Sequence, residues 1–584
     1  MLRRRSLLIL PATLVGFVFW SGLGCGGMQE NPQKNTPKTD DWTFTPSNGN
    51  DATSTSGGFS LGAPSSSPPA ATPSSATTGT SAPPPPMIPG GGGPTSTTSG
   101  GGTVGLAAGG AKDANNFRAN IANNYLPLAT DITYEGVFYD YYFDTGATSE
   151  CKALFCPSYV PMSSTDPLSQ AQEPFLSVGL NSGIKASDFA RKKLNLVVVL
   201  DVSGSMGSSF DSYYYDQSGN YVENTVDVGK AKLAIAAESI VAMLAHLQDG
   251  DRFGMVLFTD IAYQAKPLSL VEETDMAAID RHILALTPLD STNMEAGYKM
   301  GADMLAALGP VDPATYENRI ILLTDAMPNT GDTSAESLSA MVASSADARI
   351  FTTFIGIGVD FNSSLIELMT KTKGANYYSV HGSQEFKLRM DDEFDFMVTP
   401  LVFDLKLALQ SDGFAIKDVY GSPEADLATG QMLFVNTLFP SKVENNQTKG
   451  GVILALLEQT GTSNQIKLSA SYEDRSGVSG SNEVDFAYAP ALDQAPNTGI
   501  RKAILLARYV RLMKSWIESE RQNAATQAGA TSTTDWERQS LPLTVSESSR
   551  AQFRAFSAYF QSEMLAIGDD SLSQEVTVLD KLAK

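Results

Sequence analysis

The stretch LVVVLDVSGSMG, residues 196–207, starts as an apolar run and ends in a glycine-containing turn. Consecutive apolar residues predict a strand buried on both faces, as in the centre of a parallel α/β sheet. Such sheets place their sites at the carboxyl ends of the strands, and here that end carries Asp201, Ser203 and Ser205. One carboxylate and two hydroxyls at alternate positions of a tight loop suit a hard cation with oxygen ligands. The stretch therefore predicts a Mg²⁺ site.

Two later segments supply further oxygen ligands. Thr292 stands in PLDSTNMEAGYKMGADML, in a loop just before a run with helical apolar spacing. A second buried strand in ENRIILLTDAMPNTGD ends in Asp325. The Asp-x-Ser-x-Ser spacing alone fits an ordinary turn after a strand equally well. Three such loops in order, each at a strand or helix end, favour a metal site.

With these residues the chain resembles von Willebrand factor type A domains that carry a metal-ion-dependent adhesion site. The resemblance implies three metal loops, formed by Asp201, Ser203 and Ser205, by Thr292, and by Asp325. The family often has two glycines before the threonine, where this chain has Asp290 and Ser291, and a glycine after the last aspartate, where it has Ala326. None of these departures replaces a ligand, but Asp290 adds negative charge near the ion.

The resemblance also implies a function. A divalent ion, Mg²⁺ or else Ca²⁺ or Mn²⁺, keeps one coordination position for an acidic residue of a protein partner. Magnesium-dependent phosphotransfer is the enzymatic alternative, but haloacid-dehalogenase-type sites have a second carboxylate where this chain has Ser203. We therefore expect an adhesion or interaction module and no enzyme. A structural scaffold or assembly factor of an envelope complex is the other alternative.

Charge excludes one class of partner. The 584 residues include 41 basic and 64 acidic ones, for a formal net charge of −23. A surplus of this size argues against a polyanionic partner, so we expect no nucleic-acid binding.

The N-terminus has the features of a secretory signal. Arg3–Arg5 precede an apolar run from Leu7 to Trp20, which is too short for a good membrane span. The sequence GLGC resembles a bacterial lipobox, which predicts cleavage before Cys25 and its lipidation, with ordinary secretion as the alternative. We expect a lipoprotein of the cell envelope that meets the membrane only through its lipid. Gly26 after the cysteine favours the outer over the inner membrane.

Cys151 and Cys156 are close together in ECKALFCP. Because the signal directs the chain to an oxidising compartment, we expect a local disulfide, with free thiols as the alternative.

Composition and periodicity divide the chain into six parts. They are a signal peptide (1–24), a lipid-anchored disordered Pro/Ser/Thr/Gly linker (25–112), a β-rich module (113–192), the type A domain (193–394), a β-sandwich module (395–495) and a helical C-terminal region (496–584). A disordered linker of about 85 residues has an r.m.s. reach of about 50 Å.

Alternating strands and helices predict a doubly wound, Rossmann-like α/β sheet for the type A domain. The β-sandwich could pair with the β-rich module before Lys193, whose strands are expected in ITYEGVFYDYYFDTG and EPFLSVGLNSG. Two helices in the tail suggest a helical hairpin. An insertion at 208–227 is expected to form a hairpin over the metal loops. Its polar residues could alternatively bind calcium; they are Asp216, Ser218, Asn220 and Glu223.

Overall fold

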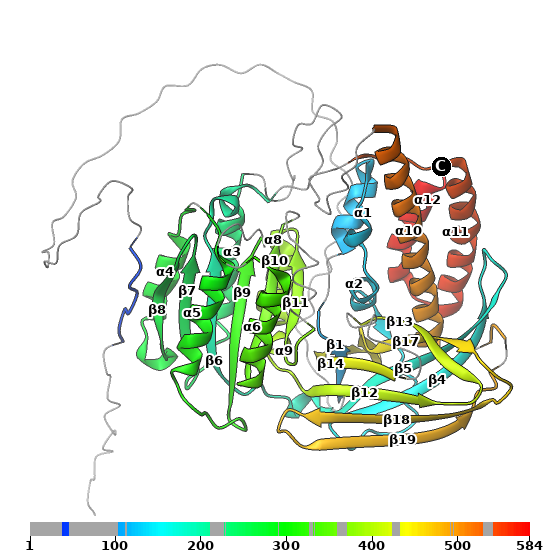
Figure 1. Ribbon diagram of the computed structural model, residues 1–584, viewed down its shortest axis with the longest axis horizontal. Coiled ribbons are helices and arrows are strands. Elements are labelled where there is room, and N and C mark those ends of the chain that lie inside the picture. The colour runs from blue at the N-terminus through cyan, green and yellow to red at the C-terminus, as the bar shows by residue number, and fades with distance from the viewer. Residues whose placement is uncertain are drawn as a thin grey trace, which may run out of the picture.

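The computed structural model describes residues 38–45, 103–110, 114–210, 227, 229–289, 291–325, 331, 333–358, 371–422, 432–490, 492–494, 496–528 and 541–584. They form an α/β domain and, beside it, a large β-sheet covered by helices (Figure 1). None of the described helices is both long and apolar enough to cross a membrane.

The α/β domain is built on a six-stranded sheet with the order β11-β10-β9-β6-β7-β8. The strands are β6 (Lys193–Asp201), β7 (Arg252–Phe258), β8 (Ala262–Leu270), β9 (Tyr316–Thr324), β10 (Ile350–Ile357) and β11 (Asn376–Val380). The chain leaves the central β6 first toward β8 and then in the other direction toward β11, which confirms the doubly wound expectation. One strand differs: β8 runs antiparallel to β7, because three residues join them and a parallel crossover needs a dozen or more.

Helices cover both faces of this sheet (Figure 1). They are α3 (Lys232–Leu244), α4 (Met276–Leu284), α5 (Met294–Ala306), α6 (Ala335–Asp347), α8 (Ser383–Lys387) and α9 (Phe394–Met397). Alternate residues of β6 enter opposite cores: Leu196 and Val198 pack with α3 and α4, whereas Val197 and Val199 pack with α5 and α6. The Ser334 side chain caps the start of α6, where it accepts a hydrogen bond from the Ser337 amide at 3.3 Å.

The second sheet joins segments from both sides of the α/β domain. Its nine strands are β1 (Thr103–Ala108), β4 (Cys156–Thr165), β5 (Gln172–Lys185), β12 (Val402–Gln410), β13 (Phe414–Tyr420), β14 (Met432–Ser441), β17 (Val452–Gln459), β18 (Gln465–Asp474) and β19 (Ser479–Ala487). β5 pairs with β17, and β1 lies between β5 and β14. The segments 113–192 and 395–495 therefore share one sheet, as the suggested pairing of the two β modules predicts. β1, by contrast, lies within the segment expected to be disordered.

The aromatic segment after residue 130 also differs from expectation. Instead of continuous strands it forms α2 (Tyr134–Tyr139) and the two-residue β3 (Tyr142–Phe143), after α1 (Ala114–Ala122). The Thr133 side chain accepts a hydrogen bond from the Gly136 amide at 3.1 Å. This N-cap and the burial of Phe138 outweigh the β propensity of the aromatic residues.

Three helices follow the sheet, one more than the expected hairpin. They are α10 (Thr498–Ala528), α11 (Glu547–Ile567) and α12 (Ser573–Leu582). The apolar stripe of α10 is core, as the spacing indicates, and it packs on Phe175 of β5 and Leu454 of β17. The remaining short strands are β2 (Tyr125–Leu126), β15 (Val443–Glu444), β16 (Gln447–Lys449) and β20 (Leu541–Pro542).

A buried ion-pair cluster connects the two parts of the molecule. The Glu393 carboxylate accepts from Arg389 at 2.5 Å and from Lys449, in the short strand β16 beside the large sheet, at 2.8 Å. Burial alone would raise the pKa of Glu393, but Arg389 and Lys449 outweigh it and lower this pKa to about 2.

Candidate functional site

The two predicted aspartates lie at the ends of neighbouring central strands. Asp201 is the last residue of β6, Asp325 directly follows β9, and both side chains are fully buried. The Thr324 hydroxyl donates to Asp201 Oδ2 at 2.7 Å, which ties the two strand ends together. The sheet order therefore brings together two residues that are 124 positions apart in the sequence.

The first loop turns back over the end of β6. The Ser203 amide donates to Asp201 Oδ1 at 2.9 Å, and a short 3₁₀ turn, Gly204–Gly207, follows. The Ser203 and Ser205 hydroxyl oxygens are 3.1 Å apart. The alternate spacing thus brings both hydroxyls to one side of the turn beside Asp201.

The second loop is fastened to the chain just after β6 and just after the neighbouring strand β7. The Leu289 amide donates to the Val202 carbonyl at 2.6 Å, and the Asn293 amide donates to the Thr259 carbonyl at 2.5 Å. Thr292 between them is 2% exposed. Ser291 has a φ of 63°, a left-handed conformation that favours glycine. A serine therefore adopts this conformation at a position where the resembling family often has glycine.

The two buried carboxyl groups of the site favour a nearby positive charge. Burial, and then the nearby Asp325, raise the pKa of Asp201 to about 7. Asp325 Oδ2 is 3.3 Å from the ammonium of Lys232, whose side chain is also fully buried. Among the residues that the structure describes, no hydrogen-bond donor reaches Asp325 Oδ1. The ammonium of Lys232 thus neighbours Asp325, and a buried charge without a partner is costly.

These side chains fit a divalent cation. Two carboxylates and three hydroxyls are oxygen ligands of the kind that Mg²⁺ takes, and the orphaned Asp325 oxygen is suited to an ion. Within the described residues, no group of three or more His, Cys, Asp or Glu side chains is arranged to hold a metal. A metal at this edge of the sheet would therefore depend on the hydroxyls.

Sequence patterns missed two neighbours of the site. Lys232 is the first residue of α3 and is completely buried, so a lysine at the start of an apolar helix was the available signal. Thr324 precedes Asp325 inside an apolar strand, and nothing local distinguishes it from a β-branched core residue.

A groove of about 560 Å³ begins next to the second loop. Asn293, the residue after Thr292, forms one end of it, and Ile261, Met300 and Met304 give it apolar walls. Ile261 is 52% exposed. The groove lies between β8 and α5, so a molecule that reaches the strand ends could also contact it.

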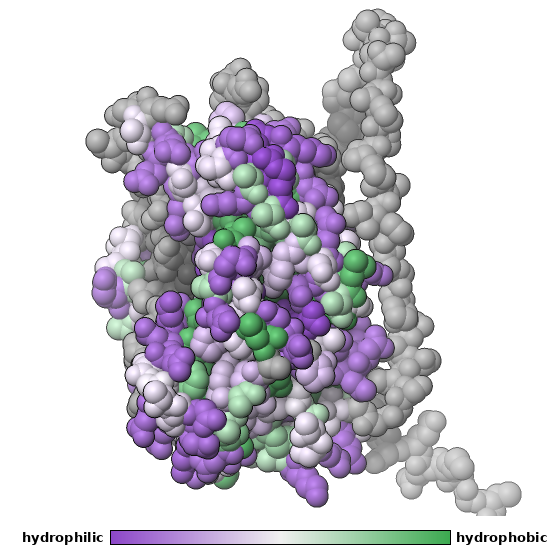
Figure 2. Space-filling model, turned by 90° about the vertical axis from the view of Figure 1, so that its right-hand side faces the viewer, coloured by the Kyte–Doolittle hydropathy of each residue, from purple (hydrophilic) through white to green (hydrophobic). Residues whose placement is uncertain are grey.

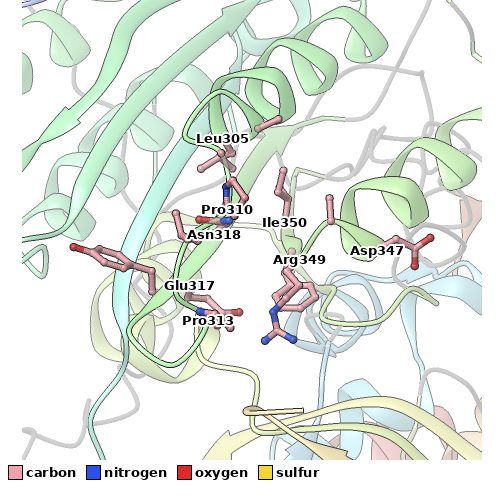
Figure 3. Close-up of a pocket in the computed structure, with 14 residues that line it drawn as sticks. Leu305, Pro310, Pro313, Glu317, Asn318, Asp347, Arg349 and Ile350 are labelled. Carbon is pink, nitrogen blue, oxygen red and sulfur yellow. The ribbon is translucent and has the colours of Figure 1, made fainter.

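A second cavity, of about 520 Å³, lies at the far end of the domain (Figure 3). Its lining includes Leu305 at the end of α5, Asp347 at the end of α6 and Ile350 at the start of β10. These elements begin and end opposite the candidate ligands, so the cavity takes no part in the site.

The structure describes the predicted cysteine pair but not several other residues named from the sequence. A disulfide joins Cys151 and Cys156, whose Cα atoms are 5.7 Å apart. Cys25, Asp290, Ala326 and the insertion at 211–226, with the four alternative calcium ligands, lie outside the described residues.

Residues 196–327 match the family model of the von Willebrand factor type A domain. The match begins in β6 and ends just after Asp325, so it includes all five candidate ligands.

Among curated proteins the chain is similar to inter-alpha-trypsin inhibitor heavy chain H4 from Homo sapiens, at 24% identity over 234 residues, 39% of this chain and 23% of the relative. Heavy chain H1 from Mesocricetus auratus is 24% identical over 233 residues, 38% of this chain and 23% of the relative. The chain spans about a quarter of the length of these relatives.

Two solved structures are also similar. A von Willebrand factor type A protein from Catenulispora acidiphila has 13% identity and a TM-score of 0.40, covering 75% of this chain and 91% of that one. The ArnB paralog VWA2 from Sulfolobus acidocaldarius has 11% identity and a TM-score of 0.34, covering 74% and 98%.

Proposed function

We propose that this chain, which carries a von Willebrand factor type A domain at residues 196–327, binds a protein partner through a divalent cation. Asp201, Ser203, Ser205, Thr292 and Asp325 would hold the ion. An acidic residue of the partner would complete its coordination. The ion is Mg²⁺, with Ca²⁺ and Mn²⁺ as the alternatives.

One observation supports this proposal above the others: Asp325 Oδ1 is buried and accepts no hydrogen bond from the described part of the chain, beside the fully buried carboxyl group of Asp201. Native proteins rarely leave such an oxygen without a partner, so each case requires an explanation. A bound cation explains the orphaned oxygen and the crowding of two carboxylates at once.

The charges around the site support an acidic ligand. Among the described residues, two ionised aspartates, the ammonium of Lys232 and a divalent ion together leave a net charge of plus one, which Asp290, outside the described residues, would lower. A buried site of that charge attracts a carboxylate. The groove beside the second loop, with Ile261, Met300 and Met304, offers apolar contact for residues that flank the acidic one.

The cellular context is part of the proposal. The signal-like N-terminus and the GLGC sequence support an envelope lipoprotein anchored through Cys25, in the outer rather than the inner membrane. Mass spectrometry of the native N-terminus would detect a diacylated or triacylated Cys25 if this is correct. Secretion without lipid is the alternative outcome of that measurement.

The scaffold alternative has less support. It predicts continuous apolar patches on the large sheet or the helical tail. On the face that Figure 2 draws, hydrophobic surface is scattered among hydrophilic residues. The exposed large hydrophobic side chains of the described residues belong to separate elements; they include Leu168, Met432, Val478 and Leu565.

Affinity capture from an envelope extract tests the function. The full chain is immobilised as wild type, Ser203→Ala and Ser239→Ala, and bound proteins are eluted with chelator. Ser239 is a matched control, because it is also a buried serine of this domain but donates to the Ile235 carbonyl within α3. We expect chelator-eluted proteins from wild type and Ser239→Ala only. Retention of the same proteins by Ser203→Ala would contradict the proposal.

A further inference from the structure

A short segment from the N-terminal part of the chain lies along the edge of the type A domain. Residues 38–45, dark blue in Figure 1, lie alongside β8, the edge strand of the six-stranded sheet. The Thr43 amide donates to the Ala265 carbonyl at 2.8 Å, and Thr39 exchanges backbone hydrogen bonds with Glu273 and Asp275, both at 2.9 Å. Backbone pairing covers part of an edge that would otherwise be open.

A buried ion pair fixes the middle of the segment. Asp41 Oδ2 is 3.1 Å from the Lys266 ammonium and accepts from the Ser269 hydroxyl at 2.7 Å. The Lys266 side chain is completely buried in β8. Burial lowers the pKa of Lys266, and Asp41 partly offsets this effect. Without the segment, the lysine would lose the carboxylate that neutralises it.

Aromatic contacts hold the residues on either side of Thr43. Trp42 stacks on His282 of α4, with ring centroids 5.3 Å apart and planes at 6°, and Asp40 is 3.0 Å from the same imidazole. Phe44 meets Tyr263 of β8 edge to face at 5.3 Å. Trp42 and Phe44 both pack against the core beneath α3 and α4. Eight residues thus combine hydrogen bonds, an ion pair and two aromatic anchors.

The direction of the segment is defined. Thr39 lies beside Thr274, beyond the end of β8, whereas Phe44 lies beside Tyr263, at its start. Because β8 is antiparallel to β7, its start lies at the edge that carries the metal loops. The segment therefore runs from the opposite edge toward the candidate metal site, and residues before Lys38 attach at the opposite edge.

We propose that residues 38–45 are a strap that orients the type A domain on its N-terminal anchor, with the metal site facing away from the membrane. This inference rests on the proposed anchoring through Cys25. Cys25 and Lys38 are 13 positions apart, with twelve residues between them, and such a stretch can span at most about 45 Å. The strap replaces a long tether to the domain with a short one, and residues 46–102 become a connection between the strap and β1.

Energy transfer to membrane lipids tests the strap. The mature chain carries a hexahistidine tag in place of Cys25 and is bound to vesicles that contain nickel-chelating lipid and an acceptor fluorophore. A donor is attached at Ile261→Cys, near the metal loops, or at Ala314→Cys, near the opposite edge, both of which are exposed. The nine residues of β6 separate the two edges by about 30 Å.

We expect higher transfer from Ala314→Cys than from Ile261→Cys, and loss of this difference when Asp41→Asn and Trp42→Ala are added. Thr45→Ala, an exposed position of the same segment, is the control and keeps the difference. Unchanged Mg²⁺ affinity of the strap variant shows that its domain is folded. Equal transfer from both positions in the wild-type strap, or a difference that survives in the variant, would overturn the proposal. The artificial anchor keeps this result independent of whether Cys25 is lipidated.

Discussion

Removing the ion should make the type A domain sensitive to pH, and the effect can be worked out from Asp201. Its pKa is raised from 3.8 to about 7, mainly by burial and then by Asp325. The folded domain therefore holds a proton that the unfolded chain releases near pH 4. Stability contributed by this proton is complete below pH 3.8 and is lost as the pH rises through 7. Between pH 5 and pH 8 the free energy of unfolding should fall by about 3 kcal/mol.

Pulse proteolysis across a urea series measures this quantity for the type A domain within the full chain. In chelator, wild type should be less stable at pH 8 than at pH 5, and Asp201→Asn should remove that part of the pH dependence, since it cannot ionise. Saturating Mg²⁺ should restore wild type at pH 8 and leave Asp201→Asn unchanged. If wild type and Asp201→Asn have the same pH dependence in chelator, Asp201 is not its cause.

Three further outcomes are expected. Lys232→Met removes the ammonium 3.3 Å from Asp325, so calorimetry should find Mg²⁺ affinity raised, on the order of tenfold, and binding of a Glu-containing peptide to the loaded site weakened. The pKa of Glu393 is lowered from 4.5 to about 2, so the stability it contributes is present above pH 4.5 and is lost as the pH falls toward 2. Acid unfolding should show a loss of about 3 kcal/mol in the free energy of unfolding over this range, and Glu393→Gln should lack that loss. Replacing Cys151 and Cys156 by serine should cost up to about 2 kcal/mol in thermal unfolding, because the closed loop is short.

The central strands and the ligand loops could be predicted because their signals are local. Five apolar residues before Asp201 indicate a doubly buried strand, and a doubly wound sheet brings successive strand ends to one edge. Lys232 escaped notice because nothing in a helix pattern shows that its ammonium reaches Asp325 on another element.

Other features depend on pairing between distant segments. The pairing of the two β segments could be suggested, but apolar alternation does not identify that β5 joins β17 across the whole type A domain, nor their register. α2 was expected as strand because its aromatic residues favour β structure, whereas the Thr133 cap and tertiary packing determine the outcome. The strap escaped notice because DDWTF is only five residues within a low-complexity region, and its structure depends on Lys266 and His282.

Calorimetric titration of Mg²⁺ into the chelator-treated full chain, repeated with Ca²⁺ and Mn²⁺, measures whether the candidate ligands hold a divalent cation. We expect saturable binding of one ion per chain in wild type and Ser239→Ala, and its loss in Ser203→Ala and Thr292→Ala. No saturable binding of any of the three ions to wild type, or equal binding by the Ser203→Ala and Thr292→Ala variants, would contradict this expectation.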